Sequence, residues 1–130
     1  MTVARTVMKT KLVTVRVETP LKEAVELLLK HKISGLPVVD SQGNLVGILT
    51  EKDVMRLMYE PKDAFRTAGD LMVREVRSFQ ADAPLADVCD CLMANSFRRV
   101  PILEGKKLVG LISRADLMPT ILEITAGQGA

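Results

Sequence analysis

The chain has 130 residues, of which 48% are hydrophobic and 3% aromatic, and its formal net charge is +2. This length fits one compact domain and leaves no room for a separate catalytic domain. The near-neutral charge disfavours nucleic-acid binding, which usually requires a concentrated basic face. No apolar run approaches the roughly 18 residues that span a bilayer, and Met1–Val15 does not resemble a signal peptide, so we expect a cytoplasmic protein.

The first half of the chain predicts the order strand, helix, strand, strand, helix. β-branched residues favour the first strand, a proline is tolerated in the first helical turn, and apolar residues then recur at helical spacing. Two further apolar runs joined by a Gly-Asn turn are typical of a hairpin. In chain order we expect a strand over Val13–Val17, a helix opening at Thr19-Pro20, strands over Leu36–Val39 and Leu45–Leu49, and a helix from Thr50.

The second half repeats the first. A shift of 64 positions places Met8 on Met72, and after one deletion in a polar turn a shift of 63 places Asp53 on Asp116. Such duplication changes the interpretation of the whole chain. The matching elements are strands over Val76–Phe79, Val100–Leu103 and Leu108–Ile112, a helix carrying Leu85, Val88, Cys89 and Leu92, and a last helix from Arg114.

This duplication defines the domain organisation that we expect. Repeat 1 covers residues 7–60, a linker 61–67, and repeat 2 residues 68–124, with a small polar tail, Thr125–Ala130, that we expect to be frayed. A unit of about 60 residues buries little surface by itself. We therefore expect an α/β (α+β) fold in which the two repeats pack with pseudo-twofold symmetry, share a core and leave a cleft between them.

Each repeat carries the motif Gly-apolar-apolar-[Thr/Ser]-x-x-Asp, as Gly47–Asp53 and Gly110–Asp116. The hydroxyl and the acid three residues later predict a capping box at a strand-to-helix junction. Capping alone leaves unexplained why both copies use Asp, since Glu or Gln is the usual partner. A carboxylate at a helix N-terminus also suits the paired hydroxyls of a ribose, so capping and ligand binding both remain open.

Other candidate residues have competing interpretations. Ser34 and Gly35 precede one middle strand and would let a ligand approach, whereas Arg98 and Arg99 at the matching positions could bind phosphate or be solvated surface charges. His31 and Lys32 end the first long helix, where positive charge is favourable without any ligand. Cys89 and Cys91 are expected to pack, because two residues of separation on a helix does not suit a disulfide.

On these motifs, together with Ser34–Asp40 and Arg98–Ile102, the chain resembles a tandem pair of cystathionine beta-synthase (CBS) domains, also called a Bateman module, over about residues 7–120. The resemblance implies a regulatory module, without enzymatic activity, that binds AMP, ADP, ATP or S-adenosylmethionine between the repeats. It implies no required cofactor and no metal. It maps one ligand site to Leu12, Val13, Ser34, Gly35, Pro37, Thr50 and Asp53, and a second to Val76, Arg77, Arg98, Arg99, Pro101, Ser113 and Asp116.

The resemblance also implies a homodimer through the last helices of each repeat, and an unknown regulated protein that would be contacted in trans. Pro119 should kink or end the last helix, although the apolar residues Leu117–Ile124 indicate that this end is covered by something. The alternative is a purely structural dimerisation module with vestigial ligand sites. No catalytic triad, phosphate-binding loop or histidine cluster supports an enzyme.

Overall fold

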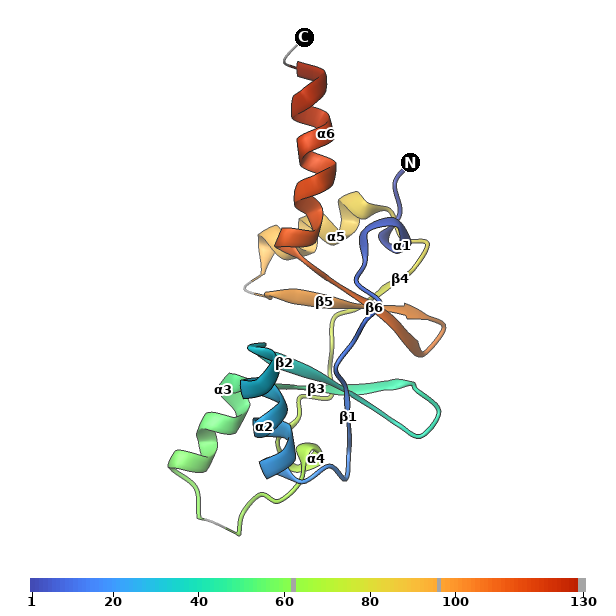
Figure 1. The fold of residues 1–130 in the computed structure, drawn as a ribbon. Coiled ribbons are helices and arrows are strands. Elements are labelled where there is room, and N and C mark those ends of the chain that lie inside the picture. Colours follow the sequence, from blue (N-terminus) through green and yellow to red (C-terminus); the bar gives the residue numbers. More distant parts are fainter. Residues whose placement is uncertain (62, 96, 129–130) are drawn as a thin grey trace. The chain divides into compact units, whose positions relative to one another are not determined.

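The computed structural model describes residues 1–61, 63–95 and 97–128. Its contacts divide the chain into two compact units. The first-repeat unit is Val13–Val76, and the second-repeat unit combines Met1–Leu12 with Arg77–Ala130 (Figure 1). Both units contain helices around a small sheet in the same order, which confirms the predicted α/β (α+β) class and the duplication.

The first-repeat unit is built on a three-stranded sheet in the order β1-β2-β3. β1 runs parallel to β2, and β2 pairs antiparallel with β3. The helix between β1 and β2 makes this parallel connection possible. The elements are β1 (Val15–Arg16), α2 (Leu21–His31), β2 (Gly35–Val39), β3 (Leu45–Thr50), α3 (Glu51–Val54), the 3₁₀ helix η1 (Met55–Met58) and α4 (Ala68–Leu71).

The second-repeat unit has the same sheet, in the order β4-β5-β6, with a parallel and an antiparallel pair. Each hairpin has a register shift at the same place, after Val38 in β2 and after Ile102 in β5. The elements are α1 (Ala4–Val7), β4 (Phe79–Gln80), α5 (Leu85–Ala94), β5 (Arg99–Glu104), β6 (Lys107–Ser113), the 3₁₀ helix η2 (Arg114–Leu117) and α6 (Met118–Gln128).

The two long core helices begin and pack as their sequences predict. Pro20 and Pro84 each stand immediately before the first helical residue, where their fixed φ suits helix entry. The apolar residues that follow recur every three or four positions and form one buried face. The buried side chains are Leu21, Ala24 and Leu28 in α2, and Leu85, Val88, Cys91 and Leu92 in α5.

The short segments that precede each first strand were not predicted as helices, and each is grouped with the compact unit of the other repeat. The backbone of α4 donates hydrogen bonds from Ala68 to Thr19 and from Gly69 to Val17. In α1 the equivalent donor is Ala4, which bonds to Ala83 at 2.9 Å. Each compact unit is therefore completed by residues that precede the first strand of the other repeat.

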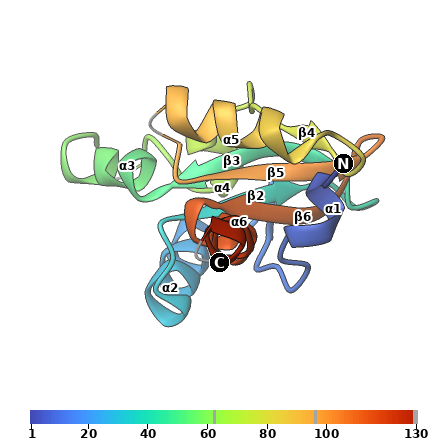
Figure 2. The same ribbon diagram turned by 90° about the horizontal axis from the view of Figure 1, so that it is seen from above.

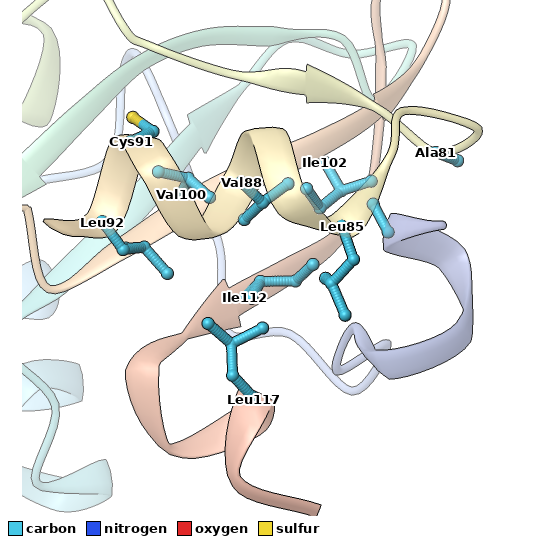
Figure 3. Packing of buried hydrophobic residues seen from close by; sticks show 10 residues of the cluster. Ala81, Leu85, Val88, Cys91, Leu92, Val100, Ile102, Ile112 and Leu117 are labelled. Atoms are coloured by element: carbon cyan, nitrogen blue, oxygen red, sulfur yellow. The ribbon is translucent and has the colours of Figure 1, made fainter. Parts of the chain in front are cut away.

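Each unit has its own hydrophobic core. In the first-repeat unit the cluster gathers around Leu36, Val38 and Leu49. Figure 3 shows the cluster of the second-repeat unit, in which side chains of α5 point toward Ile112 of β6 and Leu117 of η2. Burial of these aliphatic side chains is the main stabilising contribution to each unit.

The end of the chain differs from the prediction. Pro119 does not end the last helix, because α6 begins at Met118 and Pro119 falls in its first turn, where a missing N–H is tolerated. Residues 125–128 are helical rather than frayed, while residues 129–130 lie outside the described residues. Figure 1 shows α6 extending away from the remainder of its unit, and Figure 2 shows the same helix nearly end-on.

The first strands and the last helix of repeat 1 are shorter than predicted. β1 contains two of the five expected residues, and β4 begins at Phe79, so Val76 and Arg77 are not in a strand. The helix expected from Thr50 is one turn of α3 followed by η1, where Leu57 and Met58 are exposed. With few buried side chains, these segments lack the packing that lengthens regular elements.

Candidate functional site

The first motif forms a complete capping box at the junction of β3 and α3. The carboxylate oxygen Oδ2 of Asp53 accepts hydrogen bonds from the backbone N–H of Thr50 at 2.9 Å and from its hydroxyl at 2.8 Å. In return, the hydroxyl accepts a bond from the backbone N–H of Asp53 at 3.3 Å. Among the described residues, the other oxygen, Oδ1 of Asp53, has no hydrogen-bond or ion-pair partner, and it is the acceptor left for a ligand.

The second motif repeats this box and adds a cation. Oδ2 of Asp116 accepts from the backbone N–H of Ser113 at 2.7 Å and from its hydroxyl at 3.0 Å. Oδ1 of Asp116 lies 3.6 Å from Nζ of Lys9. The Asp116 side chain is 8% exposed, whereas that of Lys9 is 71% exposed. The free oxygen of the first motif is thus an ion-paired oxygen in the second.

A third capping box shows how much the motif alone can indicate. Thr67 and Asp70 form the same reciprocal arrangement at the start of α4. Because this box also uses Asp, and no ligand contact is predicted for it, the choice of Asp over Glu does not by itself separate ligand binding from capping. The case for a ligand must come from what surrounds Asp53 and Asp116.

Around Asp53, part of the predicted site assembles within one unit. Gly35 is the cross-strand partner of Thr50, and the carbonyl of Ser34 accepts a hydrogen bond from the backbone N–H of Glu51 at 2.9 Å. Ser34, Gly35, Thr50 and Asp53 therefore lie together where the hairpin meets α3. Pro37 lies two residues further along β2, opposite Ile48. Val13 precedes β1 without a described hydrogen bond to this group, and Leu12 is grouped with the other unit.

Around Asp116, the same positions carry positive charge. Arg99 is the cross-strand partner of Ser113, Arg98 precedes it, and Pro101 lies opposite Leu111. The Nε atom of Arg99 is enclosed and has no hydrogen-bond partner in the described part of the chain. A buried donor without a partner is costly.

The remaining predicted residues of the second site lie before β4. The guanidinium of Arg77 is 5.5 Å from the centre of the Phe79 ring, a cation–π arrangement. Val76 is the last residue of the first-repeat unit, whereas Arg77 opens the second segment of the other unit.

His31, Lys32, Cys89 and Cys91 occupy positions that their structural roles explain without a ligand. His31 ends α2, and Lys32 adopts a left-handed conformation (φ 52°) as its C-cap, with both side chains exposed. Cys91 is buried in the core and Cys89 packs against it, both as free thiols. Within residues 1–61, 63–95 and 97–128, no cluster of three or more His, Cys, Asp or Glu side chains could hold a metal ion. Nor is any helix in those ranges long and apolar enough to cross a membrane.

Sequence reasoning missed Lys9 as a site residue. Its backbone N–H and carbonyl exchange hydrogen bonds with Leu111 at 2.9 and 3.0 Å, which fixes it beside β6. The repeat alignment held a signal, because Lys9 follows Met8 where Val73 follows Met72. That signal could be recognised only after the structure had placed residue 9 next to the motif of the opposite repeat.

Together, fold and motifs define a class: a two-repeat α/β module in which each repeat presents a capped carboxylate at a strand-to-helix junction. The profile of the CBS domain matches residues 4–60 and 68–123. The chain therefore belongs to the CBS-domain family, as the resemblance predicted.

Two curated relatives from Methanocaldococcus jannaschii illustrate where such a module occurs. The uncharacterized protein MJ1225 is 29% identical over 114 residues, which are 88% of this chain and 41% of that protein. An inosine-5'-monophosphate dehydrogenase is 31% identical over 107 residues, 82% of this chain and 21% of the enzyme. The chain spans less than half the length of either relative.

Two solved structures share the fold over nearly the whole chain. CBSX2 of Arabidopsis thaliana, in a complex with AMP, has a TM-score of 0.88 at 28% identity, covering 96% of this chain and 99% of that one. The CBS domain pair of protein MJ0100, in a complex with 5'-methylthioadenosine and S-adenosyl-L-methionine, has a TM-score of 0.77 at 25% identity, covering 93% and 96%.

Proposed function

We propose that the chain is a regulatory module that binds an adenosine-type ligand, AMP, ADP, ATP or S-adenosylmethionine. The main observation in support of this proposal is the pair of capped carboxylates, Asp53 and Asp116. Each has one oxygen that its cap does not use. The ligands named for CBSX2 and MJ0100 have in common an adenosine or closely related nucleoside, and its ribose hydroxyls are donors that suit a carboxylate acceptor.

The hydrogen bonds of the cap limit what each residue would contribute. The proton of the Thr50 hydroxyl is used by Asp53, so the hydroxyl would accept from a sugar hydroxyl rather than donate to a phosphate. Phosphate binding would then fall to Arg98 and Arg99, whose planar guanidinium groups suit phosphate oxygens. The Asp116 site is therefore better suited than the Asp53 site to a phosphorylated ligand.

A regulatory role, acting on a partner in trans in the cytoplasm and without catalysis by this chain, completes the proposal. It is supported by the dehydrogenase, of which the matched segment is only 21%, so that most of the enzyme lies outside it. Ligand binding would shift a conformational equilibrium that the partner detects. Enzymatic turnover is tested by incubation with ATP and AMP: product that increases in proportion to protein would contradict this part.

Calorimetric titration with AMP, ADP, ATP, S-adenosylmethionine, NAD and GTP tests ligand binding. We expect binding of adenosine compounds only, and its loss in the double variant Asp53→Ala/Asp116→Ala. The matched control is Asp70→Ala, which breaks the third capping box and should leave affinity unchanged. Unchanged affinity in the double variant would exclude these two carboxylates as ligand residues.

The structural alternative, a dimerisation module with vestigial sites, has its own supporting observation. Four apolar side chains at the start and middle of α6 are at least 41% exposed, namely Met118, Ile121, Leu122 and Ile124. Failure of every adenosine compound to bind the wild-type chain would favour this alternative.

A further inference from the structure

The two capped carboxylates differ in one contact that the sequence repeat does not predict. Nζ of Lys9 lies 3.6 Å from Oδ1 of Asp116, whereas no ion pair reaches Asp53 among the described residues. Both carboxylates use Oδ2 for the cap. The difference therefore falls on the oxygen that remains for a ligand.

The backbone makes Lys9 and Val73 equivalent. Lys9 exchanges two hydrogen bonds with Leu111 of β6, and Val73 exchanges the same two with Ile48 of β3, at 2.8 and 2.9 Å. Both sit on the edge of a sheet, directly after a methionine that packs on the motif glycine. The only difference at this position is that one side chain is a cation and the other is aliphatic.

The ion pair has opposite consequences for neutral and anionic ligands. A ribose hydroxyl that binds Oδ1 of Asp116 must compete with the ammonium group. A neutral ligand gives that ammonium no new partner, whereas a phosphate near the ribose offers one. The long side chain of Lys9 is 71% exposed and is free to change rotamer.

We propose that Lys9 makes the Asp116 site selective for adenosine ligands that carry negative charge, an inference that rests on the proposed function. The Asp53 site, with Val73 at the equivalent position, lacks this selectivity. Lys9 is then a specificity-determining residue supplied by the start of repeat 1, before its first strand, and it acts on the motif of repeat 2.

The test compares AMP with adenosine by calorimetric titration, with one site silenced at a time. In an Asp53→Ala background, Lys9→Val should reduce the preference for AMP over adenosine by about tenfold, the size of one contact to a charged group. Lys9→Arg should keep the preference. In an Asp116→Ala background, Val73→Lys should create it, since Val73 is 48% exposed and has room for a longer side chain.

Ionic strength provides a second readout that loss of folding would not imitate. The preference of the Asp116 site for AMP should weaken as salt rises. Lys9→Val should reduce that dependence, and the part due to Arg98 and Arg99 should remain. Melting temperatures of the Lys9 variants confirm that they are folded.

The outcomes separate this inference from the proposed function. An unchanged preference in Lys9→Val, with binding intact, overturns the role of Lys9 alone. Loss of all binding in the Asp53→Ala chain also overturns it and leaves the function to the Asp53 site. Failure of the wild-type chain to bind any adenosine compound overturns both.

Discussion

Met8 covers the α-carbon of Gly110. A Cβ atom added to Gly110 would lie 2.5 Å from Sδ and 2.7 Å from Cγ of Met8. In the other unit, a Cβ on Gly47 would lie 2.7 Å from Sδ of Met72 and 2.9 Å from the backbone oxygen of Val73. The glycine of each motif is therefore required for close packing of the segment that precedes the first strand of the opposite repeat.

Gly47→Ala should destabilise the protein by about 1–3 kcal/mol, the usual cost of overpacking. Gly110→Ala should cost a similar amount, because its Cβ would lie 2.7 Å from Cγ and 2.9 Å from Cβ of Met8, which are not at the flexible end of that side chain. Chemical denaturation measures both.

Gly127→Ala is the matched control, because a Cβ there meets nothing within 4 Å and the residue lies inside α6. Alanine in a helix is favoured over glycine by about 0.5–1 kcal/mol, so this variant should not lose stability. Equal stability of Gly47→Ala and wild type would contradict the close packing of Met72 on the motif.

The capping boxes predict a graded effect on stability. Thr50→Ala removes both the acceptor for the N–H of Asp53 and a donor to its carboxylate, and should cost about 1 kcal/mol. Thr50→Ser keeps the hydroxyl and should stay near wild type. Thermal unfolding of the two variants side by side measures the cap, and an equal loss in both would show that the threonine methyl group, not the hydroxyl, is what matters.

The sequence predicted the elements whose signals are local. The faces of α2 and α5 follow from apolar spacing, and the hairpin turns follow from glycines with positive φ, 84° at Gly43 and 63° at Gly105. α1 and α4 could not be predicted, because each has four residues and is held by backbone bonds to a distant strand or loop, as Gly69 is to Val17. The effect of Pro119 on the last helix was predicted wrongly, because the sequence does not show where the 3₁₀ turn ends and α6 begins.

The residue pairs of the candidate site also divide into local pairs, which the sequence predicts, and distant pairs, which it does not. The pairing of Thr50 with Asp53 is a local pattern, and it was predicted as a capping box. The pairing of Lys9 with Asp116 joins residues at opposite ends of the chain, and only the tertiary structure reveals it.

Acid should weaken the first-repeat unit through Asp70. Hydrogen bonds from the backbone N–H groups of Arg66 and Thr67, at 2.8 and 3.0 Å, lower the pKa of Asp70 below its ordinary value of 3.8. A pKa lowered by folding gives stability that is present above the unfolded value and is lost as pH falls through the folded one. The loss should thus begin near pH 3.8 and continue below it.

Asp70→Asn tests this, because the amide keeps an acceptor oxygen but cannot titrate. The free energy of unfolding, measured from pH 6 to the acid transition, should fall less steeply below about pH 4 in the variant than in wild type. Asp40→Asn should behave similarly, since hydrogen bonds from the backbone of Asn44 and Gln42 lower the pKa of Asp40. Parallel acid transitions in all three proteins would show that these carboxylates do not govern acid stability.

Self-association should depend on α6. Leu122 is 69% and Ile124 59% exposed, and α6 has no buried residue. Exposed apolar patches of this kind commonly mark interaction sites.

The predicted homodimer would cover the exposed side chains of α6. The double variant Leu122→Glu/Ile124→Glu should therefore be monomeric in light scattering at concentrations where wild type is dimeric. Its cores should be intact, because neither side chain belongs to the described core clusters. A wild-type chain that is monomeric at every concentration, or a double variant that still dimerises, would place the interface elsewhere or remove it.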